Sequence, residues 1–323
     1  MISLAIDRYD RHFPFFDGTL PLVPELQDLK ILQVGPTSRL RDGDERQERM
    51  LRDGEFDAAE TSLASYLVAV ANGLPFTAIP VFPRRLFSQG QIFVNADAGI
   101  DTPLDLTGRT VGLQSFQTTL AVLAKGDLAA EYGVDLTTIK WRVRSDDTVE
   151  TSYPPGFDIT PLSEGANLVD ALCSGEIDAL FYSRTPTPAP EFSGRICRLF
   201  ADPRAEEKRF VEQNGYWPIM HVVALKNETV AARPDLPLEL MNAFDDARRI
   251  AADYLDDPNW SRQPWAKYTL EDENHAFDRD LWTSGLAANR KNLDRFIGYA
   301  TDQGLIDRRL DAEDLFHPSV IET

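Results

Sequence analysis

Cysteine, histidine and positive charge are all scarce in this sequence. Cys173 and Cys197 are the only cysteines and no metal-ligand motif surrounds them, so we expect two buried free thiols and no disulfide framework. The four histidines are scattered along the chain, which argues against a preformed zinc site. No apolar run approaches the roughly 18 residues that a membrane span needs. We therefore expect neither a metal centre nor a membrane partner.

The shortage of positive charge excludes another class of partner. Lysine and arginine total 33 against 52 aspartate and glutamate residues, a formal net charge of −19. Nucleic-acid binding needs a basic footprint, so we expect no such partner and attribute the acidity to solubility in a cytoplasm. The first residues, MISLAIDRYD, contain no basic segment followed by a long apolar one. Because a secretory signal would need both, the sequence predicts a cytoplasmic protein.

What is abundant is an alternation of short apolar runs with helix-length amphipathic stretches. At 323 residues with 43% hydrophobic content, the chain is long enough for two lobes with ordinary cores. Strands that alternate with helices predict an α/β fold of mixed, mostly parallel sheets flanked by helices. The expected strands are 2–6, 30–34, 57–60, 76–82, 110–113, 139–143, 177–181, 196–200 and 220–225. From about residue 234 the pattern is helical only, which predicts a C-terminal helical tail on one lobe.

One local pattern occurs twice. LRDGEFDAAETS (51–62) and LCSGEIDALFYS (172–183) both show a helix end, glycine, glutamate, an apolar residue and aspartate, followed by a strand that opens onto a polar loop. Each could be an ordinary connection between a helix and a strand. Together they indicate two pseudo-equivalent lobes.

The lobe pattern resembles the type II periplasmic-binding-protein superfamily. The pieces that carry this resemblance are GEFDAAETSLASYL (54–67), GIDTPLDLTGRTVGLQS (99–115) and GEIDALFYS (175–183). Within the superfamily, the chain is most similar to the branch of 4,5-dihydroxyphthalate decarboxylase and its relatives. That similarity rests on DRYDR (7–11), LAKGDLAAEYGVDLTTIKW (123–141) and YWPIMHVVAL (216–225). Lys125-Gly126 departs from the Arg-Gly pair of the relatives, which leaves the exact substrate open.

The resemblance implies a two-lobed fold with a ligand cleft between the lobes. Lobe 1 would comprise 1–95 plus 218–323, and lobe 2 would comprise 96–217. The implied activity is decarboxylation of a hydroxylated aromatic carboxylate by ring protonation, without a cofactor. Two alternatives stay open: a solute-binding protein for a small aromatic anion, and another cytoplasmic enzyme on the same fold. A homo-oligomer is also left open.

Arginines are the natural candidates for holding a carboxylate, because a guanidinium can donate two parallel hydrogen bonds to it. Arg84 and Arg85 stand just before the expected crossing between lobes, and Arg184 follows a lobe-2 strand. Adjacent residues of an extended chain point to opposite sides, so at most one of Arg84 and Arg85 should enter the cleft. The alternative is that both arginines are solvated or paired with nearby carboxylates.

Two helix starts could supply further anion contacts. Thr61 and Ser62 lie where a lobe-1 strand becomes a helix, and Ser115 and Thr118 lie at the equivalent place in lobe 2. Exposed N–H groups and the helix dipole favour anions at such ends. Ordinary N-capping would explain the same residue types. Both can hold at once.

The proton donor is sought among groups near the expected cleft. His221 lies on the strand that returns to lobe 1, and the pKa of a histidine suits acid–base work. His12 is the competing candidate, while Tyr9 and Asp10 could contact a ring hydroxyl. The carboxylates of Asp7, Asp10 and Glu60 could supply oxygen ligands, which leaves a loosely held metal open. Tyr153, in the loop 145–158, could stack on a bound ring or belong to a surface excursion.

Overall fold

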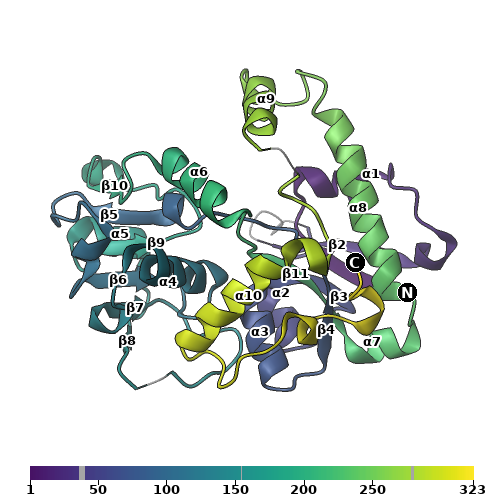
Figure 1. Ribbon diagram of the computed structural model, residues 1–323, viewed down its shortest axis with the longest axis horizontal. Helices are drawn as coiled ribbons and strands as arrows, with labels where there is room; N and C mark the ends of the chain where they lie inside the picture. Colours follow the sequence, from purple (N-terminus) through teal and green to yellow (C-terminus); the bar gives the residue numbers. More distant parts are fainter. Residues whose placement is uncertain (36–40, 154, 278–279) are drawn as a thin grey trace.

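The computed structural model describes residues 1–35, 41–153, 155–277 and 280–323. Its strands form two separate sheets, one of five strands and one of six. Figure 1 shows these sheets in two halves that lie side by side, each with helices around it. We call them the five-stranded half and the six-stranded half. The expected α/β class with two mixed sheets is confirmed.

The five-stranded sheet joins distant parts of the chain, in the order β2-β1-β3-β11-β4. β1 runs parallel to β2 and β3, whereas β11 runs antiparallel to β3 and β4. The strands are β1 (Ile2–Ile6), β2 (Leu29–Gln33), β3 (Ala58–Ser62), β4 (Phe76–Ile79) and β11 (His221–Lys226). The register pairs His221 with Ser62 and Val223 with Glu60. Because side chains alternate along a strand, Glu60, Ser62 and His221 share one face of the sheet.

The six-stranded sheet has the order β10-β5-β9-β6-β7-β8. β9, β6, β7 and β8 run parallel to one another, and β5 runs antiparallel to both β9 and β10. The strands are β5 (Ile92–Asn95), β6 (Thr110–Leu113), β7 (Lys140–Val143), β8 (Asp158–Pro161), β9 (Ala179–Phe181) and β10 (Ile196–Arg198). β5 was expected in lobe 1, so the chain enters the six-stranded sheet earlier than the sequence indicated. The lobe boundaries otherwise stay a prediction.

Helices cover both sheets and begin or end at capping residues. The side chain of Ser62 accepts from the N–H of Ser65 at the start of α3, and Thr118 accepts from the N–H of Ala121 at the start of α4. Gly133 ends α4 with φ 71°, a conformation that favours glycine. The helices are α1 (Phe13–Asp17), α2 (Arg46–Leu51), α3 (Leu63–Ala71), α4 (Thr119–Tyr132), α5 (Leu168–Ser174), α6 (Pro203–Asn214), α7 (Asn227–Ala232), α8 (Leu236–Tyr254), α9 (Ala266–Ala276) and α10 (Leu286–Asp302). Within the described residues, none of them is long and apolar enough to cross a membrane.

The C-terminal helices contact both halves, whereas the sequence predicted a tail on one lobe. α8 packs on the five-stranded half, and α10 packs against α4 of the six-stranded half, as Figure 1 shows. Gly126 of α4 permits this contact, because a Cβ at that position would lie 2.1 Å from the Tyr299 ring. Tyr299 also donates a hydrogen bond of 3.0 Å to the carboxylate of Asp127. α10 therefore joins the two halves on the side of α4.

A second contact between the halves involves the loop after β7. The Arg52 guanidinium donates to the carbonyl oxygen of Thr148 at 2.6 Å, and the Asn72 side chain donates to that of Glu150 at 3.2 Å. Both donors belong to the five-stranded half, beside α2 and α3. These bonds hold the loop of the six-stranded half against the five-stranded half.

Candidate active site

A cavity of about 470 Å³ lies between the two halves. The five-stranded half contributes Arg84, Ser62 and His221 to its wall, and the six-stranded half contributes Ser115, Thr118 and Arg184. All six were nominated from the sequence, and the structure brings them together around one hollow. Their roles in binding or catalysis stay predictions.

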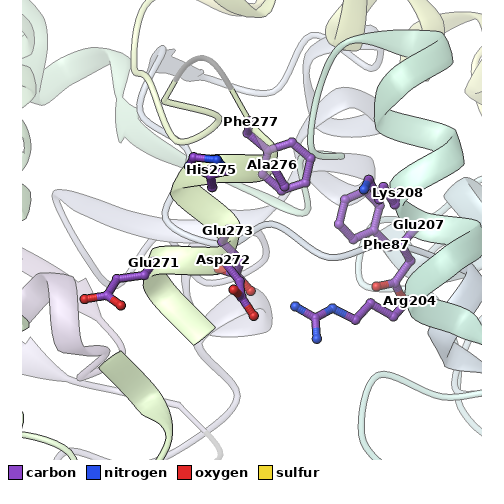
Figure 2. A pocket seen from close by; sticks show the side chains of 10 residues that line it. All are labelled: Phe87, Arg204, Glu207, Lys208, Glu271, Asp272, Glu273, His275, Ala276 and Phe277. Atoms are coloured by element: carbon purple, nitrogen blue, oxygen red, sulfur yellow. The ribbon is translucent and has the colours of Figure 1, made fainter. Parts of the chain in front are cut away.

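A larger hollow, of about 780 Å³, lies elsewhere, between α6 and α9. Figure 2 shows acidic side chains of α9 on one side of it and Arg204, Glu207 and Lys208 of α6 on the other. These side chains come from helix surfaces, and among the described residues no ion-paired side chain lines this hollow. We therefore place the candidate site in the smaller cavity, where polar groups from both sheets converge.

Arg84 and Arg85 point in opposite directions, as the alternation of an extended chain requires. Arg84 lines the cavity, and its carbonyl oxygen accepts from the N–H of Met220 at 2.8 Å and of His221 at 3.2 Å. This pairing fixes Arg84 beside the first residue of β11. In the part of the chain that the structure describes, no hydrogen bond or ion pair is formed by the Arg84 side chain. Its charge is thus available to a ligand.

Arg85 is a structural residue. Its guanidinium is buried and donates to the carbonyl oxygens of Trp217 (2.8 Å) and Thr283 (3.2 Å) and to Oδ1 of Asn289 (2.7 Å). Burial lowers its pKa. Arg85 therefore ties the crossing segment to the start of α10 and does not face the cavity.

His221 lies at the cavity wall with a carboxylate behind it. Its Nδ1 is 2.5 Å from Oε1 of Glu60, which is fully buried. Burial lowers the pKa of His221, the hydrogen bond to Glu60 opposes this, and the charges of Arg84 and Arg46 add to the lowering. The imidazole is therefore neutral near pH 7 in the free protein.

Glu60 is held by four groups from three segments of the chain. Tyr9 donates its hydroxyl to Oε1 at 3.1 Å, and the N–H of Asp7 donates to Oε2 at 3.3 Å. Arg46 forms an ion pair with Oε2 at 3.0 Å. Burial alone would raise the pKa of Glu60, but Arg46 and His221 hold it well below its ordinary value. Glu60 is therefore an ionised carboxylate inside the protein.

The starts of α3 and α4 are in direct contact at the cavity wall. Oγ of Ser62 lies 2.8 Å from Oγ1 of Thr119, the first residue of α4. The N–H of Ala64 also donates to Oγ1 of Thr119 at 3.2 Å. Ser62 and Thr118 cap their own helices as well, so ordinary capping and proximity to the cavity hold together.

Six nominated residues do not line the cavity. Two are described above: Arg85, and Tyr9, whose hydroxyl donates to Glu60. His12 is buried between Phe15 and Phe244, and its Nδ1 is 2.9 Å from the carbonyl oxygen of Asp7. Burial lowers the pKa of His12 to about 4. Thr61 is buried on the opposite face of β3 from Glu60, and Asp10 is exposed beside Arg11. His12, Thr61 and Asp10 are therefore not part of the cavity wall.

Tyr153 is the last of the six. Its hydroxyl bonds to Asp147, and its ring packs edge-on against Phe116 at 4.9 Å. It lines a different hollow, next to Val149 and Ile159. Residue 154 of the same loop lies outside the described residues. The surface-excursion interpretation of this loop fits Tyr153 better than stacking on a bound ring.

Sequence reasoning missed the functional setting of Glu60 and Arg46. Glu60 was considered only as a metal ligand, yet a carboxylate in the middle of a buried strand is itself a signal of a buried partner. Arg144 was also missed, although it lines the cavity directly after β7. Across residues 1–35, 41–153, 155–277 and 280–323, no group of three or more His, Cys, Asp or Glu side chains could hold a metal ion. Cys173 is buried as expected, whereas Cys197 is exposed.

The fold and the cavity define the class of protein: two α/β halves that enclose a ligand cavity between them, as in periplasmic binding proteins. The sulphonate-binding protein SsuA of Escherichia coli superposes with a TM-score of 0.57 at 13% identity, over 100% of this chain and 99% of that one. The desulfurization enzyme DSZB superposes with a TM-score of 0.50 at 14% identity, over 100% and 98%. Since one is a binding protein and the other an enzyme, the fold alone does not decide the function.

Relatives in sequence are more specific. The NMT1/THI5 like family model matches residues 40–153. 4,5-Dihydroxyphthalate decarboxylase of Comamonas testosteroni is 32% identical over 332 residues, covering 100% of this chain and 98% of the relative. The Pseudomonas putida protein of the same name is 30% identical over 210 residues, covering 63% and 78%. The chain belongs to the family of proteins that contains these decarboxylases.

Proposed function

We propose that this protein decarboxylates a hydroxylated aromatic carboxylate similar to 4,5-dihydroxyphthalate, by ring protonation and without a cofactor. The observation that carries the proposal is the imidazole of His221, which lines the cavity beside Arg84 while Nδ1 is bound to the buried Glu60. The names of the relatives support the same activity. Location in the cytoplasm and assembly into an oligomer stay predictions.

Binding requires positive charge in a protein that is negative overall. Arg84 from one half and Arg184 from the other line the cavity, and Arg144 adds a third guanidinium. A guanidinium can hold a carboxylate by two parallel hydrogen bonds, so an aromatic acid would be gripped from both walls. Ser62, Ser115 and Thr118 offer hydroxyl groups to ring hydroxyls or to a second carboxylate.

The chemical step needs one proton at carbon. A ring hydroxyl para to the carboxylate raises the electron density at the ring carbon that bears the carboxylate. His221 delivers a proton to this carbon, the bond to the carboxylate breaks, its electron pair returns to the ring, and carbon dioxide leaves. His221 then recovers a proton from water, so each turnover consumes one proton.

The proposal is tested by incubating the purified protein with 4,5-dihydroxyphthalate and measuring 3,4-dihydroxybenzoate and carbon dioxide. We expect turnover that survives a chelator and falls by about 10²-fold or more in His221→Gln, the range that general acid–base groups contribute. His275→Gln is the matched control, because His275 is exposed on α9 and lines the other hollow.

Binding without turnover would favour the alternative of a solute-binding protein. Turnover that His221→Gln leaves intact would remove His221 from the chemistry. Turnover that is lost with the chelator and restored by a metal ion would contradict a cofactor-free reaction.

A further inference from the structure

Glu60 does not line the cavity, but it is bonded to His221, which does. An ionised carboxylate can only accept hydrogen bonds, so the short contact of 2.5 Å requires the proton on Nδ1 of His221. In the neutral imidazole this leaves Nε2 without a proton. Because His221 lines the cavity while Nδ1 is occupied by Glu60, Nε2 is the nitrogen that remains for the cavity.

Glu60 is itself immobilised. Tyr9 and His221 donate to Oε1, while Arg46 and the N–H of Asp7 donate to Oε2. The Nε of Arg46 also donates to the carbonyl oxygen of Glu60 at 2.7 Å, so the same arginine holds both the backbone and the side chain. A buried carboxylate with both oxygens occupied has a single orientation, and the imidazole bound to it inherits that orientation.

The charged groups around His221 carry a net positive charge before a ligand binds. Glu60 contributes one negative charge, and Arg46 and Arg84 contribute two positive ones. The other charged side chains of the cavity wall, Glu48, Asp146, Arg144 and Arg184, balance one another. A bound aromatic diacid adds two negative charges, which favours the imidazolium form of His221.

We propose that Glu60 is the positioning residue of this site, holding Nδ1–H of His221 inward so that Nε2 takes up a proton when an aromatic diacid binds. This rests on the proposed function, because it supplies the proton that the ring carbon would accept. Binding of the substrate thereby protonates the imidazole that acts as the acid. Before binding, the neutral imidazole avoids an uncompensated buried charge; after binding, the imidazolium lies between Glu60 and the ligand.

Two measurements test this without turnover. Phthalate, which has both carboxylates but no ring hydroxyl, serves as the probe. Titration calorimetry in buffers of different ionisation enthalpy gives the protons taken up on binding, and we expect up to about one per phthalate near pH 7. Nitrogen chemical shifts of the imidazole give the tautomer of His221 in the free protein, and we expect Nδ1–H.

Variants give opposite signs. In Glu60→Gln the imidazolium loses its anionic partner, so the pKa of His221 should fall and the proton uptake should disappear. In Tyr9→Phe, Glu60 keeps its charge but loses one donor, so the pKa of His221 should rise. Tyr9→Phe also keeps the test decisive if Glu60→Gln does not fold. Glu228→Gln is the control, because Glu228 is exposed and pairs with Lys226 at the other end of β11.

An Nε2–H tautomer in the free protein, or equal proton uptake in the wild type and Glu60→Gln, would overturn the proposal. A shift of the His221 pKa in the same direction in Glu60→Gln and Tyr9→Phe would also overturn it. If phthalate does not bind, the tautomer and the two pKa shifts still decide. Proton uptake without decarboxylation would instead leave this inference intact and refute the proposed function.

Discussion

Replacing Arg84 and Arg85 by methionine, one at a time, should separate binding from stability within two adjacent residues. Arg85 donates to three acceptors, at 2.7 Å, 2.8 Å and 3.2 Å, and is buried. Methionine keeps most of the apolar stem but removes these three hydrogen bonds, while the Asn292 and Asn289 side chains still donate to Trp217 and Thr283. At about 1 kcal/mol for each lost bond, Arg85→Met should cost about 3 kcal/mol of unfolding free energy.

That loss corresponds to a fall of about 6–12 °C in Tm at about 2–4 °C per kcal/mol. Arg84→Met should leave Tm within about 2 °C, because no described residue pairs with the Arg84 side chain. Removing a guanidinium from a carboxylate costs about 2 kcal/mol or more, so phthalate should bind about 30-fold or more weakly to Arg84→Met.

Calorimetry supplies both quantities, from a thermal scan and from a phthalate titration of each variant. The reasoning is refuted if Arg84→Met unfolds early while retaining its affinity. It is equally refuted if Arg85→Met keeps the wild-type Tm and loses binding. Similar losses of both quantities in the two variants would show that the side chains do not divide these roles.

Three further results are expected. Gly126→Ala should lower the unfolding free energy by about 1–3 kcal/mol in urea, because the new Cβ would lie 2.1 Å from the Tyr299 ring; an unchanged midpoint would contradict this packing. Burial depresses the pKa of His12 to about 4, so the folded state resists protonation and about 3 kcal/mol of stability should be lost as the pH falls from 6.5 to 4. His12→Phe should remove that portion of the acid sensitivity in denaturation curves, and an identical pH profile would exclude His12 as its source. Lys125 is fully buried, and among the described residues its amine donates to a single acceptor, the carbonyl oxygen of Phe116. Burial lowers the pKa of Lys125 well below normal, so Lys125→Met should leave Tm unchanged or raise it, and a fall of several degrees would contradict this.

Much of the fold could be predicted because its signals are local. The run ISLAI was expected as a strand and forms β1 (Ile2–Ile6), since its apolar residues are buried on both faces of the sheet. Gly133 ends α4 in the left-handed conformation that glycine favours at helix ends, which is another local signal. β5 was misassigned because its apolar run is compatible with either sheet, and only pairing with β9 and β10 places it in the six-stranded one.

The types of residue in the candidate site could be predicted from the sequence. Which individual residues reach the cavity could be predicted only in part. His12 and His221 both stand in apolar surroundings, and the sequence alone could not separate them. The structure turns one toward Asp7 and the Phe244 ring and the other toward the cavity. Glu60 was not recognised as the partner of His221, because the two residues are 161 positions apart and meet only through the register of β3 and β11.

The sequence by itself therefore determined the kinds of elements, several of their ends and the family, because apolar periodicity, capping and short motifs depend on neighbouring residues. It also determined that at most one arginine of the pair at 84 and 85 could face a ligand, since an extended chain alternates its side chains. Only the tertiary structure decided which one. The Arg85 side chain is buried because it donates to Trp217, Thr283 and Asn289. The Arg84 side chain lies at the cavity because its backbone pairs with the start of β11. Both results depend on contacts between segments that are far apart in the chain.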